Sequence, residues 1–494
     1  MRLWRLVILG LALAASGCMV GPDYHRATTP VAVSYKELAG WKTATPEDAI
    51  ARGPWWSIYD DPLLDGLERQ VDVNNQTVKE FEAAYRNAVA LVREAQASLY
   101  PTLGIDAGVT RSNGGGGSGN FSSSSGSGSF VSSSGKGSGG SRGPITNYSL
   151  EGSADWAPDV WGRIRREVES QAAAAQVSAA DLVNAQLSAQ ATLATDYFNL
   201  RAQDSLARLL RQTVAAYRRA LEITENQYRA GTISRADVVT ADAQLQSVVA
   251  QLAGVGVLRA QYEHAIAMLI GRPPDTLSIP YSPLPETVAA PPPGLPSALL
   301  ERRPDISAAE RAMQEENALI GVAVAAYYPD ISLSALGGFV GNPLGQLLNA
   351  ANRVWSLGAS ASETLFEGGL RPAQVAAARA SYDEAVATYR QTVLVAFQQV
   401  EDELAALRIY QQQAAAEAVA VASATRAVAV LLNEYRAGTV AYTSVITEQE
   451  QLLSDEQAAL SVLQNRFIAS VTLVQALGGG WNTGLLPSQS QVRN

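Results

Sequence analysis

The sequence predicts a mostly helical chain that carries a small membrane β-sheet and contains an internal tandem duplication. Three observations support this fold class: a repeat of more than 200 residues, four segments whose apolar residues alternate, and helical segments too long for a globular domain. Hydrophobic residues make up 47% of the 494 residues and few of them are aromatic, which favours long helices.

The N-terminus has the pattern of a secretion signal. Two arginines precede an apolar stretch, residues 6–15, that is too short to span a bilayer. The small residues before Cys18 resemble a bacterial lipobox, which implies removal of residues 1–17 and N-acyl and S-diacylglycerol lipid on Cys18, enough acyl chains for stable anchoring. Met19, rather than Asp, follows the cysteine and implies delivery to the outer membrane. A plain signal peptide with an incidental cysteine would show the same segment.

The chain repeats itself at the scale of a domain. Residues 225–232 recur as 432–439, at an offset of 207 residues. The Tyr-Pro motif that opens the first expected strand of each half is offset by 228, because the Gly/Ser tract at 113–143 lengthens one loop. A repeat of this length indicates duplication of a domain rather than a solenoid.

Each repeat is expected to contain a helix, two strands and two long helices, and the two repeats flank a proline-rich connector. Repeat 1 covers 61–271, with strands at about 101–112 and 145–157 and helices at 164–229 and 234–270. Repeat 2 covers 297–481, with strands at about 328–340 and 354–366 and helices at 372–437 and 441–477. The N-terminal segment 18–60, the connector 272–296 and the C-terminal tail 482–494 lie outside the repeats.

The expected strands place apolar side chains on one face and small polar ones on the other. Tyr148, Leu150 and Trp156 share a face, opposite Ser149 and Glu151. This alternation over about ten residues is typical of a transmembrane β-barrel, although a soluble sandwich shows it too. Because closing a barrel around a pore takes about eight strands, the chain must borrow strands from copies of itself, and three copies would supply about twelve.

A membrane-spanning part is expected to be a barrel, because no stretch after Cys18 offers the roughly 20 uninterrupted apolar residues of a membrane helix. The Gly/Ser tract fits a solvent-exposed loop between the first two strands, with 341–353 as its shorter counterpart. A linker between separate domains would have the same composition.

The long helices set the length of the molecule. Residues 164–229 contain no proline and would reach on the order of 100 Å as one helix. Runs of alanine allow such helices to approach closely, as in coiled coils. A cytosolic coiled-coil scaffold would share this pattern, but it would carry neither a lipobox nor amphipathic strands.

Short blocks in order along almost the whole mature chain carry a family resemblance. They are CMVGPDY at 18–24, WW at 55–56, DPLL at 61–64, DVWGRIRR at 159–166, GLPS at 294–297, RRPDI at 302–306, NALIGVA at 317–323, LFEGG at 365–369 and ALGGGW at 476–481. Together they resemble the TolC-like outer-membrane factors, in particular the lipoprotein (NodT-type) branch that serves resistance–nodulation–division efflux pumps.

The resemblance implies a homotrimer with a twelve-stranded β-barrel in the outer membrane, continuous with a twelve-helix α-barrel in the periplasm. The segment 18–60 and the connector 272–296 would form an equatorial domain around its middle. Such a duct is not an enzyme and has no cofactor beyond its lipid. It passively conducts drugs and other toxic compounds that a periplasmic adaptor and an inner-membrane resistance–nodulation–division pump deliver.

Two helix turns with the sequence Arg-Ala-Gly-Thr are the first candidate site. Gly231 and Gly438 suit the left-handed position that ends a helix, and Ser234 with Asp237 predicts a capping-box variant after the first turn only. The resemblance implies that these turns dock the adaptor, although a merely structural hairpin needs the same glycines. The expected docking residues are Tyr228, Arg229, Ala230, Gly231, Thr232, Tyr435, Arg436, Ala437, Gly438 and Thr439.

The resemblance also places a periplasmic gate on the helix after the second turn. The family narrows its pore there with leucine and aspartate rings and opens it by an iris-like rotation. The matching positions here are Thr443 and Thr447, which predict a polar, uncharged constriction. Such a constriction would lack the cation selectivity that an aspartate ring gives. Glu448 would supply charge if its side chain turned inward.

Composition argues against several other functions. A formal charge of −10 and a pI near 5.0 disfavour nucleic-acid binding. Two histidines (His25, His264) and a single cysteine offer almost nothing for a metal or thiol site. The acidic cluster 401–403 is typical of a solvated helix face, and no nucleophile-elbow or phosphate-loop pattern is present, so no catalytic residue is predicted.

Two alternatives share the same observations. One is a type I protein-secretion exit channel on the same fold, which neighbouring genes would distinguish. The other is a pore-less structural lipoprotein, which a conductance measurement would distinguish. The transported substrate cannot be read from the sequence, because a passive duct need not recognise its cargo.

Overall fold

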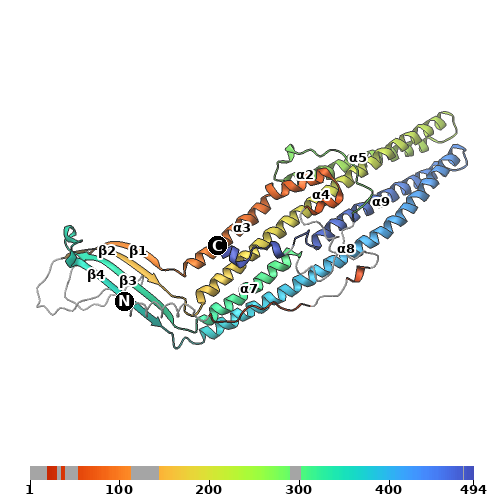
Figure 1. Cartoon of the computed structure of the whole chain (residues 1–494). Coiled ribbons are helices and arrows are strands. Elements are labelled where there is room, and N and C mark those ends of the chain that lie inside the picture. The colour runs from red at the N-terminus through yellow and green to blue at the C-terminus, as the bar shows by residue number, and fades with distance from the viewer. Residues whose placement is uncertain are drawn as a thin grey trace. The chain divides into compact units, whose positions relative to one another are not determined.

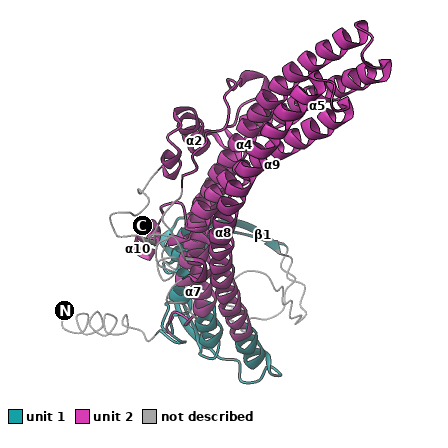
Figure 2. Cartoon of the chain, turned by 90° about the vertical axis from the view of Figure 1, so that its right-hand side faces the viewer, with its two compact units in different colours: residues 1–22, 93–168, 319–377 teal, residues 23–92, 169–318, 378–494 magenta. Residues whose placement is uncertain are grey.

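The computed structural model describes residues 19–29, 35–38, 54–112, 144–289, 302–481 and 483–493. The expected signal peptide, Cys18 and the Gly/Ser tract 113–143 lie outside the described residues. The chain divides into two compact units, which Figure 2 shows in different colours. The first comprises residues 1–22, 93–168 and 319–377, and the second comprises residues 23–92, 169–318 and 378–494. Both sequence repeats contribute to each unit.

The first unit contains an antiparallel sheet in the order β1-β2-β3-β4 (Figure 1). Its strands are β1 (Thr102–Ser112), β2 (Ile145–Trp156), β3 (Asp330–Gly341) and β4 (Arg353–Ser362). The first two strands agree with the expected ranges to within one residue. β3 starts two residues late, because the N–H of Tyr328 donates to the carbonyl of Ala325 in a turn.

The expected end of the fourth strand at 366 is wrong, because β4 ends at Ser362. The carboxylates of Glu363 and Glu367 instead accept from Arg371, at 2.5 and 3.1 Å. Glycines 368 and 369 then take positive φ angles of 63° and 91°. Because an extended strand does not use this backbone conformation, the chain leaves the sheet before these glycines and turns into the next helix.

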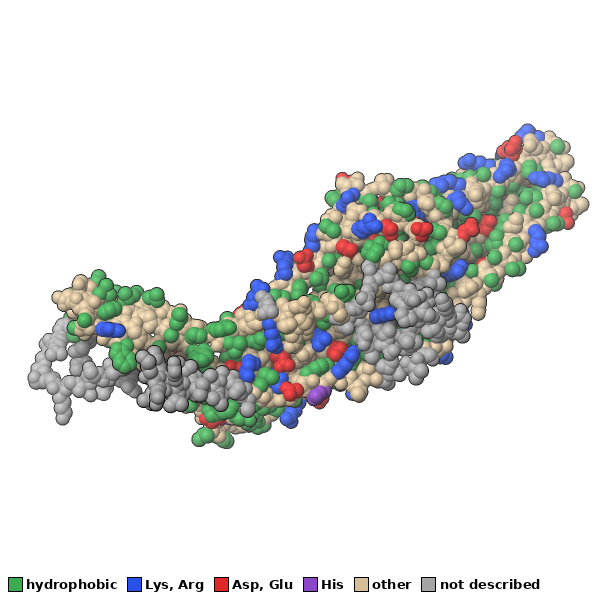
Figure 3. All heavy atoms as spheres, viewed as in Figure 1, with side chains coloured by type: hydrophobic (Ala, Val, Ile, Leu, Met, Phe, Trp, Pro, Cys, Tyr) green, Lys and Arg blue, Asp and Glu red, His purple; other side chains and the backbone are tan. Residues whose placement is uncertain are grey.

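The strand register brings the alternating apolar residues of all four strands onto one face of the sheet. Val109 pairs with Tyr148, and Gly337 pairs with Trp355. Ile105 is 83% exposed and Trp355 is 73% exposed. Figure 3 shows hydrophobic side chains over the strands, whereas charged ones are spread over the helices. Large apolar side chains exposed over a whole sheet face need a non-aqueous environment or another protein surface.

Residues 19–21, just after the expected lipid site, are fixed beside the junction of sheet and helices in the first unit. The N–H of Val20 donates to the carbonyl of Trp161 at 3.2 Å, and Arg166 donates to the carbonyls of Val20 and Gly21. The Trp161 ring stacks on Tyr328 with centroids 4.9 Å apart. These contacts hold residues 20 and 21 at the helical end of the sheet.

Seven helices of thirteen residues or more complete the described part of the chain. They are α2 (Pro62–Asn74), α3 (Gln76–Ala97), α4 (Arg163–Arg229), α5 (Arg235–Leu269), α7 (Pro304–Ala325), α8 (Leu370–Arg436) and α9 (Tyr442–Ala476). The four long helices agree with the expected ranges to within two residues.

The single helix expected at the start of repeat 1 is two helices, α2 and α3, separated at Asn75. The side chain of Asn75 donates to the carbonyl of Leu269 at 2.8 Å and accepts from the N–H of Val78 at 3.0 Å. It therefore caps the start of α3 and ties the break to the end of α5, which period-3.6 patterning alone does not reveal.

In the second unit, the α4–α5 and α8–α9 hairpins lie side by side with their turns at the same end (Figures 1 and 2). Leu210, Val248 and Leu453 belong to one buried cluster along these hairpins. Farther from the turns, the rings of Phe198 and Phe467 stack with centroids 4.6 Å apart. Packing between hairpins, rather than a central globular core, holds this unit together.

Among the described helices, α8 contains an 18-residue stretch whose mean hydropathy of 1.6 is high enough for a membrane helix, and 6% of that stretch is buried. The α8 sequence holds no run of 20 uninterrupted apolar residues, so this average does not contradict the expectation that none follows Cys18. The α8 sequence is rich in alanine and valine, which score as apolar although they are small. An exposed face of small residues is also what close helix–helix packing between copies requires.

Candidate functional site: two glycine turns and the groove between them

Both Arg-Ala-Gly-Thr turns end their helices with a Schellman motif. In the first turn, Gly231 has a φ of 74° and its N–H donates to the carbonyl of Tyr228 at 2.8 Å. The N–H and hydroxyl of Thr232 both donate to the carbonyl of Gln227, at 3.0 and 2.9 Å. The second turn repeats these contacts around Gly438, whose φ is 76°. The shared sequence therefore encodes the same turn twice.

The helices that follow the two turns begin differently. After the first, the carboxylate of Asp237 accepts from the backbone N–H and the hydroxyl of Ser234, at 3.2 and 3.0 Å. After the second, Ala441 occupies the N-cap position of α9 and offers no side-chain oxygen. The start of α5 is therefore better capped than the start of α9, which makes the two turns chemically distinct.

A groove of about 770 Å³ lies between the two turns, and both turns contribute expected docking residues to its lining. The exposure of those residues differs between the turns. Tyr228 is 45% exposed, whereas Tyr435 is 4% exposed with its ring centroid 5.0 Å from that of Tyr442. The lining residues are Asn226, Gln227, Ala230, Thr232, Ile233, Ser234, Asp237, Tyr435, Arg436, Ala437, Gly438, Val440, Ala441 and Tyr442.

Tyr435 forms a buried wall of the groove rather than an exposed contact. Burial, together with the nearby carboxylate of Asp237, raises the pKa of its phenol to about 12. The side chain is therefore neutral at physiological pH. The sequence does not single out Tyr442, because an aromatic residue four positions after a turn carries no distinctive signal.

The expected gate residues lie on the first two turns of α9. Thr443 and Thr447 are exposed, one helical turn apart, and the hydroxyl of Thr447 donates to the carbonyl of Thr443 at 3.1 Å. Glu448 is half-buried, whereas Val445 and Ile446 on the other side of the helix pack into the cluster under the turns. The two threonines thus occupy a face that the chain itself does not cover. Their role as a constriction stays a prediction.

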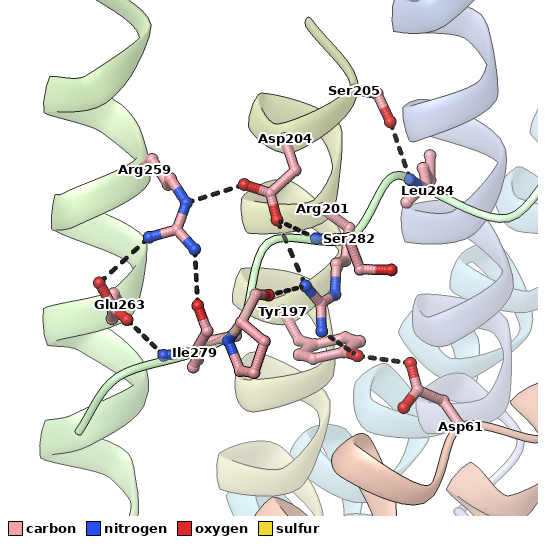
Figure 4. Close-up of polar contacts among 11 residues, drawn as sticks. Asp61, Tyr197, Arg201, Asp204, Ser205, Arg259, Glu263, Ile279, Ser282 and Leu284 are labelled. Carbon is pink, nitrogen blue, oxygen red and sulfur yellow. Dashed lines mark hydrogen bonds and ion pairs between the residues drawn. The ribbon is translucent and has the colours of Figure 1, made fainter. Parts of the chain in front are cut away.

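A buried ionic network, here called the connector clamp, fastens the proline-rich connector to the helices (Figure 4). Asp204 of α4 is fully buried and accepts from Arg259 at 2.7 Å, from Arg201 at 3.3 Å and from the N–H of Ser282 at 3.1 Å. The ring of Tyr281, in the connector, lies between Arg211 and Arg259, whose guanidinium carbons are 4.7 and 5.1 Å from the ring centroid.

The two arginines that pair with Asp204, Arg201 and Arg259, also donate hydrogen bonds to the connector backbone. Arg201 donates to the carbonyl of Pro280 at 2.6 Å, and Arg259 donates to the carbonyl of Ile279 at 2.7 Å. Glu263 accepts from Arg259 and from the N–H of Ile279. The sequence does not predict this network, because an arginine or aspartate on a long helix has the same sequence pattern whether it is exposed to water or contacts the connector.

The N-terminal segment has a comparable attachment on α8. Glu401 accepts from the N–H groups of Lys36 and Glu37, at 2.6 and 3.0 Å, and Arg408 pairs with Glu37 at 2.5 Å. The interpretation of 401–403 as a solvated acidic face is therefore wrong for Glu401. Its carboxylate is used because the first N–H groups of the short 3-10 helix Lys36–Leu38 have no partner within that helix and need acceptors.

Two of the acids on the polar face of the sheet lie directly opposite each other, which the sequence pattern alone does not show. Asp106 of β1 pairs directly with Glu151 of β2, and Gly338 of β3 pairs with Glu151 on the other side. A Cβ at Gly338 would lie 2.7 Å from the Glu151 Cα, so glycine makes room for this acid. In the described part of the chain, no three His, Cys, Asp or Glu residues are grouped to hold a metal ion.

Comparisons with known proteins agree with this geometry. Residues 67–272 and 295–479, one block in each repeat, match the family described as outer membrane efflux protein. The solvent efflux pump outer membrane protein SrpC of Pseudomonas putida is 30% identical, with 95% of this chain and 97% of that protein covered. The probable efflux pump outer membrane protein TtgC of Pseudomonas putida is 28% identical, with 98% of both covered.

A solved structure shares the fold over nearly the full length. The outer-membrane channel OprN superposes with a TM-score of 0.84 at 29% sequence identity, covering 94% of this chain and all of that chain. The expected fold class, a protomer that contributes four strands and four long helices to a trimeric channel, is confirmed. This chain belongs to the outer membrane efflux protein family.

Proposed function

We propose that this chain is the exit duct of a tripartite efflux pump, carrying small toxic molecules passively across the outer membrane. The observation that carries the proposal is the family match over both repeats, on a chain whose sheet has one exposed apolar face and one small, polar face. The relatives named for toluene, solvent and antibiotic efflux in Pseudomonas putida support a small-molecule cargo rather than a secreted protein.

In the trimer the apolar face meets lipid and the polar face lines the lumen, because exposed leucine and tryptophan are stable only on the lipid side. The chain supplies a path and no chemistry, and the energy comes from an inner-membrane pump of the resistance–nodulation–division class. Planar-bilayer recording of purified trimers tests this function. Conductance supports the duct, and its absence in trimers with truncated turns supports the pore-less lipoprotein instead.

We also propose that the groove between the two turns docks the helical hairpin of a periplasmic adaptor. Two Schellman turns at one end of the unit, with a 770 Å³ groove between them, give a rigid surface that a helix end can enter. The unequal capping of α5 and α9 makes the surface asymmetric. An adaptor can therefore approach in one orientation only.

Adaptor capture by substituted trimers tests the docking proposal. Gly438→Pro removes the N–H that bonds Tyr435 and cannot take the φ of 76°. Gly438→Ala adds backbone strain alone, because no atom lies within 4 Å of its new Cβ. Gly254→Ala, which also has open space but lies inside α5, is the matched control. Undiminished capture by Gly438→Pro would rule out docking at this turn.

The gate and the lipid anchor complete the proposal. Thr443, Thr447 and Glu448 line the closed entrance, and rotation of the α8–α9 hairpin opens it. Cys18 carries the lipid, and the contacts of Val20 and Gly21 support an anchor beside the helical end of the sheet. Cys18→Ser is expected to abolish labelling by radioactive palmitate while leaving the trimer able to conduct.

A further inference from the structure

The charged residues of the sheet are sorted by sign between its two faces. The four described strands contain six charged residues: Asp106, Arg111, Glu151, Asp155, Asp330 and Arg353. The register places all four acids on the polar face. Both arginines lie on the apolar face, because Arg111 alternates with Val109 and Arg353 alternates with Trp355. The charges on the lipid-facing side of these strands are therefore purely cationic.

The two arginines also stand at the same end of the sheet. Arg111 is the penultimate residue of β1, which runs away from the helices, and Arg353 is the first residue of β4, which runs back toward them. Both are exposed. A cation on the lipid face is costly at the bilayer midplane but nearly free at the interface, where a long side chain reaches the headgroups. Their position fits the interface on the loop side.

The edge strands bring these arginines together between neighbouring chains. β1 and β4 are the two edges of the sheet in one chain, so closing the trimeric barrel pairs β1 of one chain with β4 of the next. The strands are antiparallel and meet with their loop ends together. Because the alternation fixes which face meets lipid, both guanidinium groups project on the lipid side of the same seam.

We propose that Arg111 of one chain and Arg353 of the next form a binding site at each seam for phosphate groups of outer-leaflet lipid headgroups. A guanidinium matches phosphate geometry with two parallel hydrogen bonds, and two of them from adjoining strands hold one phosphate from both sides. The site is incomplete in a single chain, so it exists only in the closed trimer. It rests on the proposed barrel but not on the proposed cargo.

Lipid retention by purified trimers tests this site. Trimers are reconstituted in nanodiscs with lipid A or with its dephosphorylated form, and the lipid bound after extraction is counted by native mass spectrometry. Arg111→Gln with Arg353→Gln is expected to lower retention of lipid A about a hundredfold, roughly tenfold for each charged hydrogen-bonding partner lost. Retention of the dephosphorylated lipid is expected to stay unchanged.

The control is Arg218→Gln, which removes an exposed arginine of α4 and is expected to retain lipid A as the wild type does. Equal retention by the wild type and the double variant would overturn the proposal. Equal loss of both lipids would also overturn it, because the arginines would then act on the lipid face in general. If the double variant does not form trimers, each single variant is measured in the same way. Unchanged conductance shows that the duct itself is intact.

Discussion

Substituting Asp204 tests whether the connector clamp holds the proline-rich connector in place. Asp204→Asn keeps the size of the side chain but removes the charge that two arginines share at 2.7 and 3.3 Å. Arg201 is 5% exposed at the side chain and loses its carboxylate partner in a largely dry site, whereas Arg259, which is 18% exposed, keeps its pair with Glu263 at 3.3 Å. Breaking a buried pair in this way costs about 3 kcal/mol.

Chymotrypsin offers a direct assay, because Tyr281 sits in the connector and is held between Arg211 and Arg259. A loss of about 3 kcal/mol raises the population of the released connector on the order of a hundredfold. Cleavage after Tyr281, followed at fixed trimer concentration, is expected to accelerate accordingly. Thermal unfolding of the trimer provides a second readout of the same loss.

Two variants separate the clamp from general damage. Asp242→Asn removes an exposed acid that accepts from Gln246 within the same helix, and it is expected to change the cleavage rate little. Asp204→Asn with Arg201→Gln removes the stranded charge and is expected to recover part of the protection. A cleavage rate in Asp204→Asn equal to that of the wild type would refute the reasoning.

Three further predictions concern other sites. Glu37→Gln breaks the partly exposed pair with Arg408 and is expected to cost at most about 1 kcal/mol, measured by thermal unfolding. Burial raises the pKa of Asp196 from 3.8 to about 6, so the folded chain binds the extra proton and stability falls as pH rises through this range. Asp196→Asn is therefore expected to stabilise the trimer at pH 8 and to have little effect at about pH 3, which unfolding midpoints at both values check. Asp106→Asn with Glu151→Gln removes the facing acids of the polar sheet face, and reversal-potential measurements are expected to show lower cation selectivity with conductance retained.

Periodicity in the sequence predicted the strands and the long helices. Alternation located the four strands, and the 207-residue offset matched the helices of the two repeats to each other. Local signals failed where a distant contact decides the outcome. Asn75 breaks the first helix because it bonds Leu269, which lies 194 residues away along the chain. The residues around Asn75 do not predict this contact.

In the candidate site, too, features with a local sequence signature were predictable and features that depend on distant packing were not. Gly231 and Gly438 were predictable, because a left-handed turn residue has a local signature. The burial of Tyr435 was not, since it depends on the packing of two hairpins from different repeats. The gate at Thr443 and Thr447 stays a prediction, because the ring they would form exists only between chains.

Each repeat holds a separate segment of the chain against its long helix, but the segment and its contacts differ between the two repeats. Arg201 and Arg408 occupy equivalent positions, 207 residues apart, and each fastens a strap of chain to its helix. In the first half the strap is the connector, and its fastening is buried. In the second half it is the N-terminal segment, joined by a partly exposed ion pair. A trimer of a duplicated chain approximates a sixfold ring, and this difference breaks that symmetry into alternating firm and loose sectors. The pore opening proposed above is therefore expected to be concentrated in every second sector and to have threefold rather than sixfold symmetry.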